Sequence, residues 1–201
     1  MKPISFVLPA ILLSGCSIFP TPEPKTQYTL SSPTPLVKAT KILQPALVIK
    51  VPTADASLNT AEIAVSPSPG TRTYIEGALW TDRAPVVLQN LLIQGFQNSG
   101  VFSNVGTPGT GIAANIILDS QLRDFSVHYE GNTPVIVVDL YMKIFNLKAR
   151  QIIEGKRFEV RVNANQNNQI AIRQGFQDAV DHLTTDIIQW LVTKNLMTNQ
   201  I

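Results

Sequence analysis

The side chains of this sequence that could perform acid–base or metal chemistry are few. Its only two histidines are His128 and His182. His182 follows Asp178 by four residues, so on a helix the two would be neighbours and could form a carboxylate–histidine dyad. No serine nucleophile in a G-x-S-x-G turn accompanies them, and a zinc site needs three or four ligands at characteristic spacings. We therefore expect a solvated helical face here, with no catalytic residue, no metal and no bound cofactor.

A glycine-rich stretch matches a nucleotide-binding fingerprint in an unsuitable context. Residues 109–114, GTGIAA, fit the G-x-G-x-x-A form, whose glycines let a pyrophosphate approach the start of a helix. The residues that follow, NIILDSQLRDF, have the pattern of a strand. This stretch is therefore predicted to be a flexible loop. The P-loop signature is absent, which argues against ATP hydrolysis by that route.

Cys16 is the single cysteine, and its surroundings indicate a specific modification. It follows a largely apolar run over residues 4–13 and the small residues Ser14 and Gly15. This run is too short to cross a bilayer as a helix, which needs roughly 20 residues, so residues 1–15 are predicted to be a cleaved signal peptide. The sequence LSGC resembles a bacterial lipobox. In that motif the thiol receives diacylglycerol, the preceding peptide bond is cut and the new amino group is acylated. We expect this lipidation at Cys16 and no disulfide.

Lipidation at Cys16 would decide the location of the protein. Three acyl chains make detachment negligible, because each buried methylene contributes ~0.8 kcal/mol. Residue 17 is Ser rather than the Asp that resembles an inner-membrane retention signal, so we expect the periplasmic leaflet of the outer membrane. Residues 16–26 are rich in proline and are predicted to form a stiff spacer. Lys and Arg number 16 against 14 Asp and Glu, without a basic cluster, which excludes nucleic acid as an expected partner.

Residues 27–201 are predicted to form a single domain of the α+β class. Alternating apolar residues predict short strands near residues 27–31, 47–51 and 62–65, and residues 74–80 read as a further extended piece. A helix follows, capped by Asp82, with Pro85 in its first turn and Gly100 after its end. The expected architecture is a mainly antiparallel sheet with two helices packed on one face, in the order β-β-β-α-β-β-β-β-α.

The second half of the domain has the stronger pattern. One long strand is expected over residues 116–129. Its inward-facing apolar positions switch from even to odd numbers near Arg123 and Asp124, which predicts a bulge. Two further strands, ending near residue 162, complete a three-stranded meander. The chain then forms a helix over about residues 168–194. Its apolar residues recur at helical spacing and should face the core: Phe176, Val180, Leu183, Ile187 and Leu191.

Three aromatic residues leave two interpretations open. Tyr74, Trp80 and Phe96 could line a groove that contacts lipid or a partner. Alternatively they fill the core between helix and sheet, which is the more usual place for aromatic residues at such spacings.

Several stretches together resemble a known family. They are the lipobox at Cys16, QYTL after a proline-rich spacer, LW followed by TDRAPVVLQNLL, and the closing RQGFQDAVDHLTTDIIQWL. These are similar to the ABC-type transport auxiliary lipoproteins of the PqiC and YmbA group, in which Arg-Trp usually stands where this chain has Leu79 and Trp80. The resemblance implies work beside an MCE-domain protein and membrane permeases that move phospholipid or other hydrophobic compounds between the inner and outer membranes. It also implies docking of the MCE assembly at the outer membrane, with a ring of copies as one arrangement.

Three functional hypotheses remain open from the sequence. A docking subunit predicts an exposed protein-binding surface and co-purification with an MCE partner. A lipid carrier predicts an apolar cavity of its own, large enough for acyl chains. A periplasmic hydrolase predicts convergent polar groups in a cleft, and the scarcity of catalytic side chains disfavours it.

Overall fold

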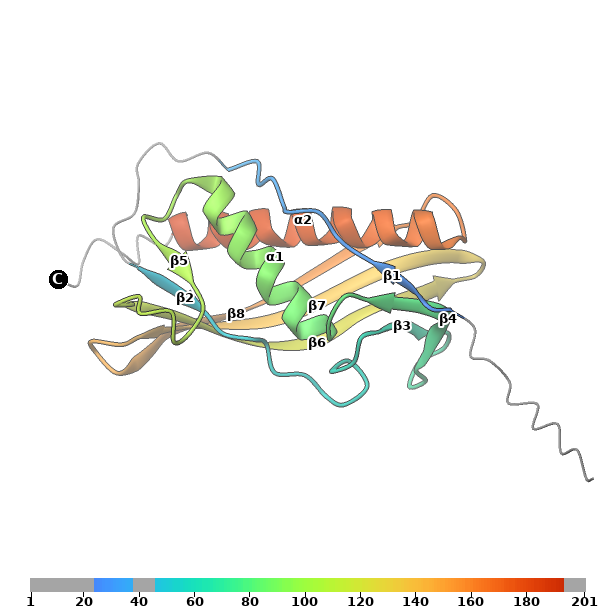
Figure 1. Ribbon diagram of the computed structural model, residues 1–201, viewed down its shortest axis with the longest axis horizontal. Coiled ribbons are helices and arrows are strands. Elements are labelled where there is room, and N and C mark those ends of the chain that lie inside the picture. The colour runs from blue at the N-terminus through green and yellow to red at the C-terminus, as the bar shows by residue number, and fades with distance from the viewer. Residues whose placement is uncertain (1–23, 38–45, 194–201) are drawn as a thin grey trace, which may run out of the picture.

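The computed structural model describes residues 24–37 and 46–193, which form a curled sheet with two helices (Figure 1). The predicted signal peptide, residues 1–15, and Cys16 lie outside the described residues. None of the helices in these two stretches has the length and apolar character needed to span a membrane. The elements are, in chain order, β1 (Thr26–Tyr28), β2 (Leu47–Ile49), β3 (Glu62–Ser66), β4 (Thr73–Trp80), α1 (Ala84–Ser99), β5 (Val105–Gly106), β6 (Ile116–Glu130), β7 (Thr133–Asn146), β8 (Gln151–Asn163) and α2 (Gln169–Thr193).

The α+β class is confirmed, but the expectation of a mainly antiparallel sheet is wrong. β7 pairs antiparallel with β6 and β8, which is the predicted meander. β6 also pairs in parallel, with β2 at residues 116–118 and with β3 at residues 126–128. β1 and β5 add parallel pairings with β4 and β2, so the sheet is mixed. Alternating apolar residues reveal which face a side chain occupies and not the direction of the neighbouring strand, which is why the parallel pairings were missed.

Four strands precede α1 instead of the three in the predicted order. The extended piece expected over residues 74–80 is β4, which pairs with β3 on one side and with β1 on the other. The register between β3 and β4 shifts along β4, and Gly77 there has a φ of 68°, a conformation that side chains with a Cβ rarely adopt. This irregularity interrupts the alternation of β4, which is why the sequence predicted only an extended piece there and did not count it as a strand.

The predicted bulge in the long strand is confirmed. Leu122 of β6 lies opposite Leu140 of β7, and Asp124 lies opposite Asp139, so Arg123 is the extra residue. The bulge keeps apolar residues inward on both sides of it, and these are buried: Ile116, Leu118, Leu122, Phe125 and Val127. The bulge also brings the outward-facing residues in the second half of β6 onto one face of the sheet.

Both helices cover one face of the sheet, as predicted (Figure 1). α1 has Pro85 in its first turn, and its last residue, Ser99, is followed by Gly100, whose φ is 64°. The expected cap was wrong in detail: Asp82 Oδ1 accepts a hydrogen bond from the amide of Arg83, at 2.6 Å, and no side chain caps α1. In α2 the predicted apolar stripe is buried: Phe176, Val180, Leu183, Ile187 and Leu191.

Two glycines let the helices approach closely. A Cβ on Gly95 of α1 would lie 2.5 Å from Cγ2 of Thr184 on α2, and one on Gly175 would lie 2.8 Å from Cδ1 of Ile136 on β7. Such distances leave no room for a methyl group. The two helices and the sheet therefore form one closely packed core.

Residues 29–37, which we call the N-terminal strap, run from β1 across both helices (Figure 1). The Ser31 amide donates to Oε1 of Gln177 on α2, at 2.6 Å, and Nε2 of Gln177 donates to the Ser31 carbonyl, at 3.2 Å. Nδ2 of Asn98 on α1 donates to the Pro33 carbonyl, at 2.9 Å. Pro33 and Pro35 are buried. The strap thus fixes the chain that leads from the predicted spacer to both helices.

Candidate functional site

Two of the three aromatic residues proposed for contact lie in the core. Trp80 is 1% exposed and packs against the rings of Phe125 and Phe176. Phe96 is fully buried and stacks on Phe102, with ring centroids 5.2 Å apart. These positions match the alternative in which the aromatics fill the core, and they offer no surface to a ligand in this conformation.

Tyr74 is partly exposed and lies in a different setting. It lines a surface pocket of about 350 Å³ beside β1 and β4, together with Lys25 and Glu62. Its hydroxyl donates to the Ser57 carbonyl, at 3.2 Å. Ser57 is held in turn by Asp55, and this hydrogen bond is the main cause of the lowered pKa of Asp55. The structure therefore does not gather the three predicted contact residues into one site.

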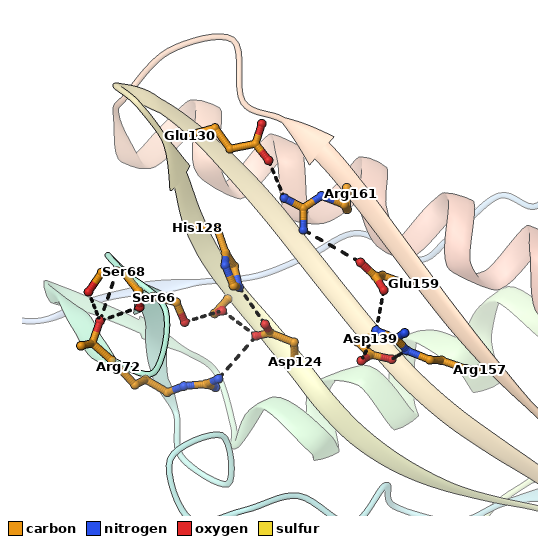
Figure 2. A network of polar contacts seen from close by, with 12 residues as sticks. Ser66, Ser68, Arg72, Asp124, His128, Glu130, Asp139, Arg157, Glu159 and Arg161 are labelled. Carbon is orange, nitrogen blue, oxygen red and sulfur yellow. Dashed lines mark hydrogen bonds and ion pairs between the residues drawn. The ribbon is translucent and has the colours of Figure 1, made fainter.

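The outer face of the sheet, which is the face away from the helices, carries a polar cluster that the sequence analysis did not identify (Figure 2). At its centre Asp124 accepts hydrogen bonds from Nε2 of His128, at 2.7 Å, and from the Ser126 hydroxyl, at 2.6 Å. Nη2 of Arg72, which follows β3, lies 3.7 Å from the same carboxylate. The Ser66 hydroxyl lies 3.4 Å from that of Ser126. Side chains of β6 and of the segment after β3 thus meet at one half-buried carboxylate, and Ser66 of β3 lies beside it.

A second polar group continues along β7 and β8 (Figure 2). Arg157 holds Asp139 through two hydrogen bonds of 3.0 Å, from Nε and Nη2, and also contacts Glu159. Bonding to Asp139, together with the charges of Asp139 and Glu159, raises the pKa of Arg157 above its ordinary value. Arg161 joins Glu159 to Glu130 of β6. We call this group the arginine ladder; it neutralises Asp139, which is only 8% exposed.

The arrangement of these groups is unsuited to nucleophilic catalysis. His128 bonds to Asp124 as in a catalytic dyad, but the Ser126 hydroxyl donates to the carboxylate and not to the imidazole. The other dyad that the sequence suggested is not formed either: Asp178 accepts from Gln174, at 2.8 Å, and His182 is exposed. Within residues 24–37 and 46–193, no three His, Cys, Asp or Glu side chains gather in a way that could hold a metal ion.

The glycine-rich stretch also has the predicted form. Residues 109–114 lie in the connection between β5 and β6, outside any helix. Gly109 and Gly111 have φ angles of 86° and 74°. The stretch leads into a strand, so the helix start that would bind a pyrophosphate is missing.

A family model for ABC-type transport auxiliary lipoprotein components matches residues 28–188. The chain belongs to this family. The match runs from the last residue of β1 into the final turns of α2, so it includes every element between them. The family resemblance seen in the sequence is confirmed. Membership associates the chain with ABC-type transport and, as a lipoprotein component, with a membrane.

Solved structures agree with this fold. A Xanthomonas campestris protein of the DUF330 family has a TM-score of 0.77 and 22% identity, covering 88% of this chain and 99% of its own. A second solved structure, of an uncharacterized protein, has a TM-score of 0.65 and 14% identity, covering 84% of this chain and 99% of its own.

A curated protein is similar in sequence. This uncharacterized protein of Bradyrhizobium diazoefficiens is 27% identical over 175 residues, covering 85% of this chain. This chain spans about half the length of that curated relative, 46%.

In this auxiliary lipoprotein, Leu79 and Trp80 face opposite sides of β4. Trp80 points into the core, whereas Leu79 is partly exposed. Leu79 lies opposite Gln27 of β1 and Glu62 of β3. Residue 79 therefore lies beside the strand through which the chain enters the domain.

Proposed function

We propose that this chain is a non-catalytic docking subunit of an MCE-type ABC transport system that moves phospholipid or other hydrophobic compounds between the inner and outer membranes. It is anchored on the periplasmic side of the outer membrane by lipid on Cys16 and contributes to the integrity of that membrane. The partners are an MCE-domain protein and its membrane permease, with a ring of several copies as part of the same proposal. The observation that carries the proposal is the family match over residues 28–188.

The polar groups of the outer face support docking more than catalysis. Asp124 and Asp139 are the least exposed carboxylates of this face, and both are bonded to basic side chains of the same chain. A general acid or base needs an atom that can donate a proton to a substrate or accept one from it. Paired carboxylates instead stabilise the strands and leave a polar surface with balanced charge, and the rim of a protein interface is likewise polar.

The chain entry supports a tethered arrangement. A proline-rich chain rises ~3.1 Å per residue, so the predicted spacer lets Lys25 stand on the order of 28 Å from Cys16. Lys25 lies 3.9 Å from Glu62 of β3, and the strap that follows β1 is bonded to both helices. Force on the spacer would therefore act on the whole core.

Chemical crosslinking in intact envelopes, followed by purification of the full-length lipoprotein, tests the proposal. The expected result is strong enrichment of an MCE-domain protein and its permease over a purification from cells without the tagged chain. Cys16→Ala should abolish that enrichment, because the domain no longer stands at the membrane. Purification of the wild-type chain without any transport component would contradict the proposal.

A further inference from the structure

One end of the outer face carries an apolar row beside basic side chains, unlike the polar cluster and the arginine ladder. A hollow of about 320 Å³ is lined there by residues that we call the distal patch: Lys50, Ile117, Asp119, Lys143, Phe145 and Ile152. Ile117 of β6 lies directly opposite Phe145 of β7, which in turn lies opposite Ile152 of β8. The three side chains therefore form one continuous apolar row across three strands.

This row is more exposed than a folded domain requires. Ile152 is 57% exposed, and Ile117 and Phe145 are partly exposed. Val51 and Leu147 come from segments next to the patch and are 42% and 39% exposed. Apolar side chains that gather on a surface with a charged rim mark an interaction site more often than isolated exposed ones do.

The charge of the distal patch is positive. Nζ of Lys50 lies 3.0 Å from Asp119, which neutralises that carboxylate. Lys143 lies opposite Asp119 and reaches over the ring of Tyr141, 5.9 Å from its centroid. The turn between β7 and β8 adds Lys148 and Arg150, which are both exposed. The complement of this end is a ligand with negative charge around an apolar centre.

The distal patch is remote from the tether. The chain enters through β1, which reaches β6 through β4 and β3 at residues 126–128. Ile117 lies about ten residues earlier on β6, which corresponds to roughly 30 Å along the strand. Figure 1 accordingly shows β1 and β4 toward one end of the sheet and β2 and β5 toward the other. The patch is thus displaced from the side at which the anchor would hold the domain.

We propose that the distal patch binds an acidic segment, with at least one large apolar side chain, of a periplasmic protein of the transport system. This inference rests on the docking function proposed above. A lipid would fit less well, because pockets for small ligands enclose 70–90% or more of the ligand surface, whereas this hollow lies among partly exposed side chains on one face of the sheet. A large side chain inserted between Ile117, Phe145 and Ile152, with a carboxylate near Lys143, gives the apolar centre and charged rim of an interface.

A photo-crosslinking amino acid at position 152 in the full-length lipoprotein, activated in intact envelopes, identifies the occupant. The expected adduct joins residue 152 to a peptide that contains Asp or Glu and belongs to a periplasmic domain of a co-purifying transport component. An adduct with phospholipid, an adduct with a second copy of this chain, or no adduct would each overturn the inference. The control carries the same photo-crosslinking amino acid at position 170, because Ile170 is 74% exposed at the start of α2, outside the patch.

Two substitutions measure the contribution of the patch. Ile152→Asp and Lys143→Glu should each reduce capture of the transport component at least about tenfold, the loss expected for a central interface residue. Ile170→Asp and Lys143→Arg should retain capture, and equal melting temperatures establish that all four variants are folded. Unchanged capture by both patch variants would overturn the proposed role of the distal patch and leave the proposed docking function intact. Absence of any transport component with the wild-type chain would overturn both.

Discussion

Single residues of α2 show how strongly burial constrains this domain. Leu183 is fully buried within the core cluster. Leu183→Asp would place an unpaired charge there and should reduce the free energy of unfolding by more than about 4 kcal/mol. Thermal denaturation followed by circular dichroism measures this loss. Gln189→Asp, an exposed position of the same helix, is the control, and equal melting temperatures for the two variants would contradict the placement of the stripe.

Asp181 predicts a pH-dependent effect. Burial raises the pKa of Asp181 above its ordinary value of 3.8, and the charge of Asp178 acts in the same direction, against the hydrogen bond from Gln177. The folded state therefore favours the protonated acid, and the ionised form opposes folding at neutral pH. Asp181→Asn should raise the melting temperature at pH 7, and the gain should shrink as the pH falls toward 3.8. Its control is Asp186→Asn, at an exposed position of α2; a gain that persists or grows at acidic pH would contradict the assignment.

At the scale of elements, α1, α2 and the strap meet at Gly95. A Cβ at this position would lie 2.5 Å from Cγ2 of Thr184 and 3.1 Å from Cβ of Pro33. The hydroxyl of Thr184 donates to the Val180 carbonyl, at 2.7 Å, and this hydrogen bond holds the side chain in place. A rotation of the side chain that relieved the crowding would disturb this hydrogen bond.

Gly95→Ala should lower stability by about 1 kcal/mol, because overpacking of about 1–3 kcal/mol exceeds the gain of about 1 kcal/mol in helix propensity. Urea denaturation measures this difference. Thr184→Ser removes the clashing methyl group, so the double variant should recover the loss. Equal effects of Gly95→Ala with and without Thr184→Ser would show that the clash is not the cause.

The elements that the sequence predicted well are those with long, regular periodicity. The bulge at Arg123 follows from the change in inward parity, and the stripe around Leu183 follows from helical spacing. The short strands β1, β2 and β5 have two or three residues each, too few to show which strand they pair with or in which direction. Their parallel pairing depends on contacts with β4 and β6 that are distant in the sequence.

The outer-face cluster had only an indirect signal in the sequence. With the bulge at Arg123, the next outward-facing positions of β6 are Asp124, Ser126 and His128. Their spacing of two residues would by itself have grouped them on one face. Arg72 could not be added, because it reaches Asp124 through the parallel pairing of β3 and β6. The distal patch was missed for the same reason: Lys50 directly follows β2, whose parallel position beside β6 brings it to Asp119 and was not predicted.

At the scale of the whole molecule, the proposed location depends on the residue after Cys16. The variant Ser17→Asp carries a single change. It places directly after Cys16 the Asp that resembles an inner-membrane retention signal. The lipidated chain should then move from the outer-membrane to the inner-membrane fraction of a sucrose gradient. Ser17→Thr is the control and should stay with the outer membrane. A Ser17→Asp chain that remains entirely in the outer-membrane fraction would contradict sorting by residue 17.

The proposed function requires a domain held permanently at a membrane through Cys16. The strap and β1 fix residues 24–37 to the core, so a lipid at the start of the spacer would restrain the entire fold. The intact mass of the mature protein, extracted from the outer-membrane fraction, tests this most directly. We predict a polypeptide that begins at Cys16 and carries a diacylglycerol and one further acyl chain. A mass that retains residues 1–15, or one that begins at Cys16 without lipid, would contradict the tether and the docking function that depends on it.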